Sequence, residues 1–281
     1  MPLCYFVSDL HGKPHRFEAL FASVEAGRPA ALFIGGDILP HHLHTGSGEF
    51  IGGYFLGGLA ALRERMKDAY PRVFVILGND DGRLDEKALI KAGKDGLVEY
   101  VHGRKASFGR WTIYGYAYIP PTPFRLKDWE RYDVSRYVDP GSISPEEGAR
   151  TIPVPEDEAR YSTIKEDLEK LAGPGGLENA LFLFHAPPYR TKLDRAALDG
   201  RMVDHVPLDV HVGSIAIQRF IEERQPLVTM HGHIHESPRI TGSWRDRIGR
   251  THLYSAAHDG PELALVSFDP EDPEAAKRDL I

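Results

Sequence analysis

The sequence predicts a single large α/β domain with a mostly parallel sheet and helices on its faces. Apolar strand-like runs alternate with helical patterns along most of the chain, as in folds built from βαβ units. The 281 residues fit one such domain, because α/β folds often exceed the usual domain size. The content of 42% hydrophobic and 27% charged residues is typical of a globular protein.

The first part of the chain contains most of the predicted elements. Strands are expected at 3–7, 30–34, 73–77 and 111–116, with short ones near Val98 and Ala106 and helices at 16–25 and 50–69. The second helix is expected to stop before Pro71, which cannot continue it. Asp85 is placed to cap a further helix that runs to about Lys91.

The regular pattern breaks between about residues 120 and 155. This stretch combines several prolines with aromatic residues and charges of both signs. We interpret it as an insertion or lid over the site, although a surface excursion without a role is an equally good interpretation. A second irregular segment is expected at 189–212.

The remaining elements are predicted from apolar runs and one amphipathic pattern. Helices are expected at 156–172 and 215–223, strands at 180–184 and 227–230, and two more strands within 251–268. The charged segment 269–281 is expected to be a peripheral or frayed tail, so the predicted domain covers residues 1–268.

Five polar clusters follow strand-like runs at points spread along the chain. They are Asp9-Leu10-His11, Gly36-Asp37, Gly78-Asn79-Asp80-Asp81, His185-Ala186-Pro187-Pro188 and Gly232-His233-Ile234-His235. Open α/β sheets bind ligands at the carboxyl ends of their strands, so these clusters are expected to meet. Carboxylate, imidazole and amide oxygen suit Mn²⁺, Fe²⁺ or Zn²⁺. A carboxylate such as Asp37 can bridge two ions about 3.5–4 Å apart, which activate water and hold a phosphoryl group.

In this order the motifs D-x-H, G-G-D, G-N-x-D, H-x-P-P and G-H-x-H resemble the calcineurin-like metallophosphoesterase superfamily over residues 9–235. The resemblance implies a four-layer α/β/β/α sandwich of two mixed sheets flanked by helices. It also implies two divalent metal ions, such as Mn, Fe or Zn. The first would be held by Asp9, His11, Asp37 and His235, and the second by Asp37, Asn79, His185 and His233. Asp81 and His231 are expected to lie behind these ligands.

One residue departs from the family pattern. Asp80 stands where the family has a histidine that is thought to protonate the leaving group. Asp80 could act as the acid in a protonated form. Another histidine could replace it, with His41, His42, His44, His211 and His258 as candidates. The hydrolase could also be weak, or limited to good leaving groups.

Other side chains near the clusters allow a functional or a structural interpretation. The helix start at Gly213-Ser214 could bind phosphate, but an ordinary N-cap is the commoner explanation. The cations Arg125, Lys127, Arg190 and Lys192 could clamp a phosphate, yet acidic residues lie among them. The aromatic residues Tyr118, Phe124, Trp129 and Tyr132 could stack on a substrate or form a small satellite core.

The sequence therefore predicts a dinuclear metal-dependent phosphoesterase that acts on a small phosphorylated substrate. Attack by a metal-bound hydroxide would cleave a phosphomonoester, phosphodiester or pyrophosphate bond. The alternative is a weak or inactive metal-binding scaffold on the same fold that binds a protein partner. A nuclease is less compatible with the net charge of −7, so nucleic acid is not an expected partner. The longest apolar stretch, 50–62, is too short for a membrane span, and a cytoplasmic location is expected. The oligomeric state stays open.

Overall fold

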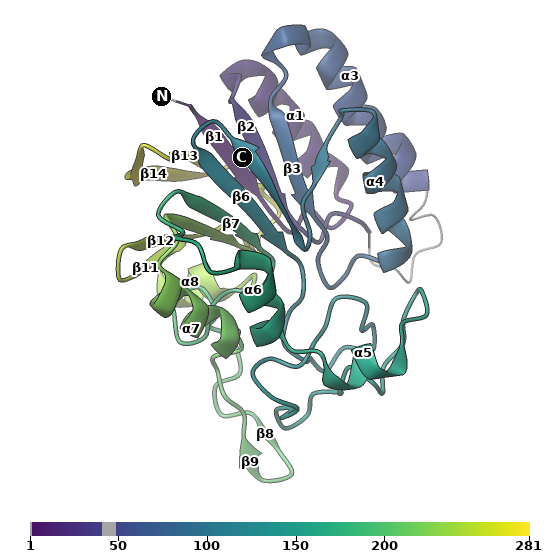
Figure 1. The fold of residues 1–281 in the computed structure, drawn as a ribbon, viewed down its shortest axis with the longest axis vertical. Coiled ribbons are helices and arrows are strands. Elements are labelled where there is room, and N and C mark those ends of the chain that lie inside the picture. The colour runs from purple at the N-terminus through teal and green to yellow at the C-terminus, as the bar shows by residue number, and fades with distance from the viewer. Residues whose placement is uncertain (1, 41–48) are drawn as a thin grey trace.

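The structure is a computed structural model that describes residues 2–40 and 49–281. Six strands form its first sheet (Figure 1), in the spatial order β14 (Asp272–Leu280), β13 (Ala264–Asp269), β1 (Cys4–Val7), β2 (Ala31–Gly35), β3 (Arg72–Ile76) and β4 (Glu99–Tyr100). The strands β1 to β4 run parallel, while β13 is antiparallel to β1 and β14 is antiparallel to β13. The expected strands at 3–7, 30–34 and 73–77 are therefore confirmed to within one residue at each end.

A second mixed sheet of six strands lies beside the first. Its order is β11 (Arg245–Ile248), β12 (Thr251–Ser255), β10 (Val228–His231), β7 (Ala180–Phe184), β6 (Trp111–Tyr116) and β5 (Arg104–Phe108). The strands β6, β7, β10 and β12 are parallel, and the two edge strands are antiparallel to their neighbours. The two sheets face each other, with β2 against β7 and β3 against β6.

Helices cover the outer faces of this pair of sheets (Figure 1). Helices α1 (Pro14–Gly27), α3 (Gly57–Met66) and α4 (Glu86–Lys94) lie on one side, and α6 (Ile164–Ala172) and α7 (Ile215–Arg224) lie on the other. Buried aromatic rings fill the interior, where Phe33 stacks on Phe74 at 5.2 Å and Tyr114 on Phe182 at 4.5 Å. The expected α/β/β/α sandwich of two mixed sheets is confirmed.

Two predicted helices differ in detail from the structure. The pattern at 156–172 forms two helices, α5 (Glu156–Tyr161) and α6, because Thr163 is extended and its hydroxyl caps α6 by accepting from the Glu166 amide. The pattern at 50–69 contains a π-helical turn before α3 and a 3₁₀ turn after it. Asp85 does occupy the N-cap of α4, but its side chain makes no capping hydrogen bond, so that part of the prediction is wrong.

The C-terminal segment 269–281, predicted to be a peripheral or frayed tail, is part of the fold: it lies at the edge of the first sheet but is not frayed. Most of it forms β14, whose pairing with β13 runs from Asp272 opposite Asp269 to Leu280 opposite Ala264. Ala276 of β14 is buried and belongs to the hydrophobic core. The irregular segment 189–212 also contains a short hairpin, β8 (Met202–Val203) and β9 (Val206–Pro207), that the sequence did not predict.

The insertion, residues 120–155, is fastened to the rest of the domain by two acidic side chains, the buried Asp128 and the half-buried Asp133. Asp128 accepts hydrogen bonds from the Arg83 amide and from Thr151. Asp133 accepts from the Ser214 hydroxyl and from the amides of the first two residues of α7. These contacts hold the insertion against the start of α7 and against the loop that follows β3.

The aromatic residues in and beside the insertion differ in burial. Tyr118, Trp129 and Tyr132 are buried, and Tyr118 and Trp129 belong to the main hydrophobic core and not to a separate satellite core, whereas Phe124 is exposed. No helix within residues 2–40 and 49–281 is both long and apolar enough to cross a membrane.

Candidate metal centre

The five polar clusters meet at one edge of the sandwich. The expected ligands follow β1, β2, β3, β7 and β10, and within each sheet these strands are parallel. Four of the seven expected ligands have a positive φ, a conformation that non-glycine residues rarely adopt: Asp9 (58°), His11 (49°), Asp37 (50°) and His233 (73°). Such backbone strain costs about 1–3 kcal/mol per residue and concentrates at functional sites.

Four side chains converge on a first position. One ligand atom each from Asp9, His11, Asp37 and His235 lies within 4.8 Å of the others. The Nε2 atoms of His11 and His235 are 3.1 Å apart. His235 Nε2 lies 3.3 Å from Asp9 Oδ1, and His11 Nε2 lies 3.8 Å from Asp37 Oδ2. Two imidazoles and two carboxylates thus face the same point.

A second position shares Asp37 with the first. Ligand atoms of Asp37, His185 and His233 also lie within 4.8 Å of one another. His185 Nε2 is 3.4 Å from Asp37 Oδ2 and 3.0 Å from Asn79 Oδ1, so the amide oxygen of Asn79 joins this group. The structure therefore brings together all seven side chains that the motifs singled out, in the two predicted groups.

The pKa shifts of these groups reflect the charges that they place on one another, and both carboxylates stay ionised. Burial alone would raise the pKa of Asp9, but the hydrogen bond and charge of His235 outweigh it and lower that pKa to about 2. Burial would likewise raise the pKa of Asp37, but the charge and hydrogen bond of His185 outweigh this effect and lower that pKa. Burial and the charge of His185 lower the pKa of His233 to about 3. Against the effect of burial, Asp37 raises the pKa of His185 to about 10.

One buried oxygen at the centre favours a bound cation. Asp9 Oδ2 is buried and has no hydrogen-bond partner among the described residues, which is costly for a carboxylate unless a cation or donor faces it. The donor set also contains only nitrogen and oxygen, which suits divalent first-row metals. The residues present therefore fit two divalent ions, with Asp37 common to both positions.

Glycines allow the ligand loops to approach one another. A Cβ on Gly78 would collide with Asp37 Oδ1 and with the ring of His185. A Cβ on Gly232 would collide with Ser8 Oγ and lie 2.7 Å from Asp9 Oδ2. Close backbone approach thus explains the glycine in two of the motifs.

Asp81 fastens two of the ligand loops to each other. Its carboxylate accepts hydrogen bonds from the backbone amides of Ile38, Leu39 and Gly78, at 3.0, 2.8 and 2.9 Å. Burial and the charge of Asp37 raise the pKa of Asp81 to about 8, against the effect of those amides. The residue lies behind the ligands, as expected, and acts on their backbone.

His231 also lies behind the centre. Its Nδ1 is 2.8 Å from the Ala186 carbonyl and its Nε2 is 2.7 Å from the Thr229 hydroxyl. The ring stacks on Phe184. These contacts fix the backbone beside His185 and leave the ring facing away from both metal positions.

The sequence did not single out Arg16, which supports the first ligand loop. This arginine is buried in α1, and its guanidinium donates to the carbonyl oxygens of Asp9, Gly260 and Pro261. It holds the backbone of Asp9 against a loop that is distant in the sequence. The only sequence signal is a basic residue near the start of a helix, which most surface helices also show.

Asp80 lies at the edge of the centre. Its backbone amide donates to Asp37 Oδ1 at 2.8 Å, and its Oδ2 lies 3.5 Å from His11 Nδ1. The other candidate acids differ in position. His211 and His258 line the same cavity as Asp80, while His41, His42 and His44 lie outside the described residues.

A cavity of about 1200 Å³ opens above the metal centre. Its lining includes ligands at one end and parts of the insertion and of segment 189–212 at the other. Among the cations considered as phosphate clamps, Arg125 lines this cavity, whereas Lys127 is buried in an ion pair with Glu130. The start of α7 is capped by Ser214 and by Asp133, which confirms the N-cap interpretation.

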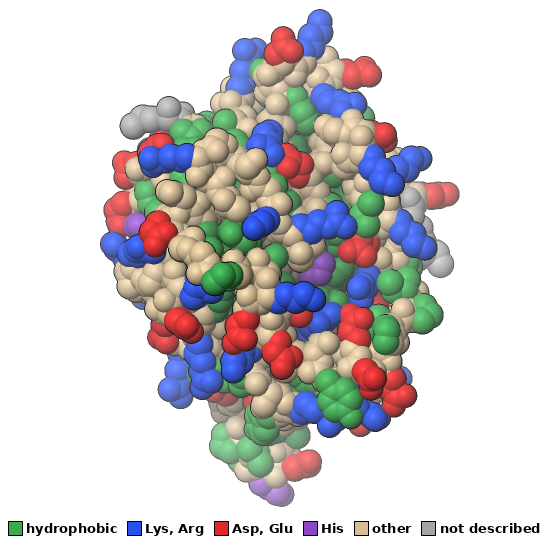
Figure 2. Space-filling view, in the orientation of Figure 1, with side chains coloured by type: hydrophobic (Ala, Val, Ile, Leu, Met, Phe, Trp, Pro, Cys, Tyr) green, Lys and Arg blue, Asp and Glu red, His purple; other side chains and the backbone are tan. Residues whose placement is uncertain are grey.

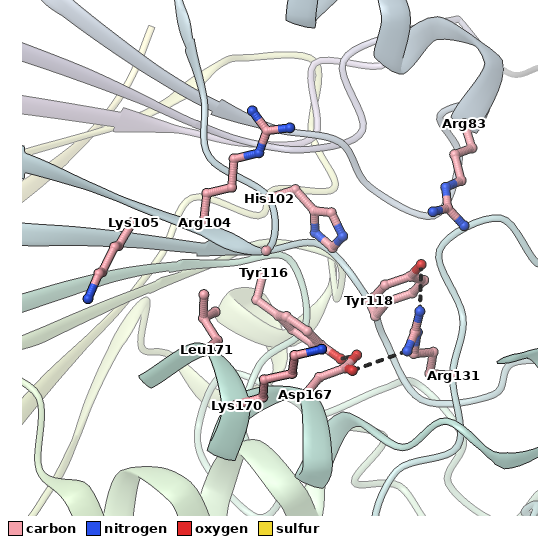
Figure 3. Close-up of a pocket in the computed structure, with 11 residues that line it drawn as sticks. Arg83, His102, Arg104, Lys105, Tyr116, Tyr118, Arg131, Asp167, Lys170 and Leu171 are labelled. Carbon is pink, nitrogen blue, oxygen red and sulfur yellow. Dashed lines mark hydrogen bonds and ion pairs between the residues drawn. The ribbon is translucent and has the colours of Figure 1, made fainter. Parts of the chain in front are cut away.

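A smaller cavity of about 500 Å³ lies away from the metal centre (Figure 3) and contains none of the expected ligands. Several cations line it, but Arg104 and Lys105 point in different directions. Arg131 is engaged by Tyr118, Asp167 and Glu158. The charges of this cavity therefore do not converge on one point.

Comparison with known proteins agrees with this geometry. The model of the calcineurin-like phosphoesterase family matches residues 4–237. The uncharacterised protein MJ1162 of Methanocaldococcus jannaschii is 39% identical over 77 residues, which are 27% of this chain and 29% of that protein. The sequence alignment thus spans less than a third of that relative.

Solved structures share the fold at low sequence identity. The protein TT1561 of Thermus thermophilus superposes with a TM-score of 0.56 at 14% identity, covering 99% of this chain and 98% of that one. Phosphopantetheinyl hydrolase (PptH) of Mycobacterium tuberculosis gives 0.51 at 14% identity over 92% and 90% of the two chains. A dimetal phosphatase of Danio rerio gives 0.51 at 12% identity over 95% and 92%.

Proposed function

The chain belongs to the calcineurin-like phosphoesterase family, and we propose that it hydrolyses a phosphoester bond with two divalent metal ions held by its seven clustered side chains. The observation that carries this proposal is the position of Asp37, whose carboxylate belongs to both groups of ligand atoms. A carboxylate that faces two cation positions suits a two-metal hydrolytic site. Mn, Fe and Zn all suit the donor set, and the substrate is a phosphomonoester, phosphodiester or pyrophosphate.

Each part of the chain has a defined task in this proposal. When bound, the two cations would supply a water of lowered pKa and would neutralise charge on the phosphoryl oxygens. Asp9, His11 and His235 hold the first position, and the loops after β3, β7 and β10 hold the second. The backbone amide of Asp80 orients Asp37, and Asp81 keeps the loops of Asp37 and Asn79 at a fixed separation.

The leaving oxygen needs a proton. A carboxyl group, Asp80, or one of two histidines that line the cavity could supply it. Asp80 is the nearer to the ligands, with its carboxylate beside His11. His211 and His258 lie further along the lining, where each ring is held by an acidic partner, Asp194 or Glu262. A leaving group that is stable as an anion, such as a phenolate, needs none of them.

The scaffold alternative is favoured by one observation, the aspartate in place of the family histidine. A protein that binds a partner without hydrolysis needs no acid at position 80. It also has no need for two complete ligand groups, and both are assembled here. We therefore place hydrolysis first and use activity to separate the two.

The first experiment compares the wild-type protein with Asp37→Asn. We expect about two divalent metals per purified chain, and Mn²⁺-dependent hydrolysis of p-nitrophenyl phosphate or bis-p-nitrophenyl phosphate. Removal of the shared carboxylate should lower activity by roughly 100-fold or more and reduce the metal content. The ratio of the two rates distinguishes a monoesterase from a diesterase.

The matched control is Asp157→Asn, the same change at an exposed aspartate in α5. It should retain both metals and full turnover. Turnover by Asp37→Asn that equals the wild type would disprove the assignment of the site. Two bound metals without hydrolysis of either ester would instead favour the scaffold.

A further inference from the structure

The cavity above the metal centre is larger than a phosphate needs. Its volume of about 1200 Å³ exceeds the roughly 300–1,000 Å³ of pockets for drug-sized ligands. One end contains Asp37, Asn79 and His233. The cavity continues from there between the insertion and segment 189–212, so a phosphate at the ligands would leave most of the volume for the organic part of a substrate.

The walls of this remaining volume are largely apolar. They come from both segments and from the start of α7, and include Pro121, Phe124, Val134, Leu198, Leu208 and Val212. Ligand sites whose lining is mainly hydrophobic bind apolar groups, with a few polar groups fixing orientation. Here the ligands at the inner end would fix the phosphate, and charged side chains such as Arg125 and Asp139 lie among the apolar ones.

Several polar groups along the walls are already engaged within the protein. Asp133 is occupied at the start of α7, and Asp209 accepts from the Tyr189 hydroxyl at 2.6 Å. The guanidinium of Arg16 is bound to three carbonyl oxygens. A sugar or a nucleobase would have to compete with these internal hydrogen bonds, and an apolar chain would not.

Both segments also carry exposed apolar side chains. Phe124 and Tyr137 of the insertion line the cavity and are 57% and 67% exposed. The β8–β9 hairpin carries exposed Met202 and Val206, and hydrophobic side chains lie together above the histidine at the bottom of the view (Figure 2). Exposed apolar side chains thus occur on both segments that form the cavity wall.

We propose that the substrate is an amphiphilic phosphoester, with its phosphate at the metal centre and a long apolar chain along the walls formed by the two segments. This proposal rests on the proposed phosphoesterase function and names its substrate class. The shared chemistry is a phosphate joined to an alkyl-type chain, whether acyl or isoprenoid. Contact area along the chain would provide the affinity, and the phosphate would fix the position of the bond that is cleaved.

The test varies the length of the substrate's alkyl chain while the reaction stays the same. Methyl, butyl and octyl p-nitrophenyl phosphates share one leaving group, and the corresponding alkyl phosphates serve if the protein is a monoesterase. All are assayed with Mn²⁺ below their micelle concentration. Each added methylene that is fully buried should lower KM by up to about fourfold. Burial of about three of the added methylenes would therefore raise kcat/KM for octyl over methyl by roughly 50-fold.

One variant and one control test whether the wall at Leu208 binds the alkyl chain. Leu208→Asn places an amide in the half-buried wall and should reduce the octyl-over-methyl ratio by roughly 5- to 10-fold. Leu84→Asn makes the same change at an exposed leucine outside this cavity and should keep the ratio. A ratio that Leu208→Asn leaves unchanged would contradict this wall as the chain-binding surface.

Binding of non-hydrolysable alkylphosphonates separates this proposal from the proposed function. Calorimetry should show tighter binding and a more negative heat-capacity change for octylphosphonate than for methylphosphonate. That result without hydrolysis of any ester would support the apolar site and contradict the hydrolase. Hydrolysis with no dependence on chain length, or a preference for a nucleotide such as AMP over octyl phosphate, would overturn the substrate class alone.

Discussion

At the scale of single residues, Asp80 has a role that its position in the motif did not suggest. Its Oδ2 faces His11 Nδ1 at 3.5 Å, while His11 Nε2 faces the first metal position. A carboxylate on the second nitrogen of a metal-binding imidazole fixes the orientation and tautomer of the ring. Asp80 can therefore orient a ligand even if it donates no proton.

This contact predicts the outcome of Asp80→His. Because the imidazole cannot replace the carboxylate beside His11, metal affinity should fall about 10-fold or more, the range found when such outer partners are removed. Calorimetric titration with the metal measures this affinity. Asp80→Asn is the comparison variant, because it keeps the shape of the side chain and loses its charge. Faster hydrolysis of poor leaving groups at unchanged metal affinity would show that Asp80 is merely a weak substitute for the family histidine.

A second residue-scale prediction concerns His102, which lies far along the chain from the ligands. Burial, followed by the charges of Arg131, Arg83 and Arg104, lowers the pKa of His102 to about 3. Its Nδ1 accepts from the Ala117 amide, which requires the neutral ring. An unfolded histidine titrates near pH 6.5, so between pH 6.5 and 3 the unfolded state binds the extra proton and stability falls as the pH falls.

The variant His102→Asn keeps an acceptor for the Ala117 amide and removes the titration. We expect the wild type to lose about 1 kcal/mol more stability than this variant between pH 7 and pH 5, after allowance for partial solvent access. Urea unfolding at both pH values gives the difference. Parallel pH dependence in the two proteins would show that His102 is not held neutral by the fold.

At the scale of elements, the insertion is anchored where it crosses the start of α7. Asp133 accepts from Ser214 Oγ and from the amides of Ile215 and Ala216, at 2.5, 2.7 and 3.2 Å. Asp133→Ala should lower stability by about 1–2 kcal/mol because the helix start loses an acidic cap. The same change should increase proteolytic cleavage within 120–155 without increasing cleavage elsewhere.

Asp157→Ala, at an exposed position in α5, is the control for this anchor. Limited proteolysis and urea unfolding of both variants separate the loss of the anchor from a general effect of removing a carboxylate. Unchanged protection of residues 120–155 in Asp133→Ala would mean that other contacts, such as the hydrogen bond from the Arg83 amide to Asp128, hold the insertion in place.

Some of the helices and strands could be predicted from the sequence, and others could not. Apolar runs predicted the central strands because both faces of those strands are buried. The break between α5 and α6 was also readable, since Thr163 and Glu166 have capping-box spacing. The edge strands β11 and β14 are charged and mostly exposed, so no hydrophobic pattern marks them. Their pairing depends on distant strands, which local patterns do not contain.

For the candidate site, short motifs predicted the clustered side chains well because their spacing follows strand ends. The supporting contacts were harder to predict. Arg16 is joined to residues 244 and 245 positions away, and Asp133 to a helix start 81 to 83 positions away. The shape of the cavity depends on two irregular segments, whose packing no periodicity describes.

At the scale of the whole molecule, the metal centre joins the two halves of the sandwich. Asp9 and Asp37 follow strands β1 and β2 of the first sheet, whereas His185 and His233 follow β7 and β10 of the second. The carboxylates and imidazoles of opposite sheets face each other across the shared positions. A bound cation would therefore hold one sheet against the other as well as prepare the site for a phosphate.

This arrangement predicts that metal binding stabilises the entire domain. Ligands that bind only the folded state add about 2.7 kcal/mol at a concentration 100 times Kd, which for a chain of this size raises Tm by about 5–10 °C. Scanning calorimetry of metal-free protein titrated with Mn²⁺ measures the shift, and Asp37→Asn should show little of it. Because the ligands belong to both sheets, the transition should move as one cooperative unit. A metal-dependent shift of only a minor part of the transition would place the centre in a local subdomain and contradict its role as a link between the sheets.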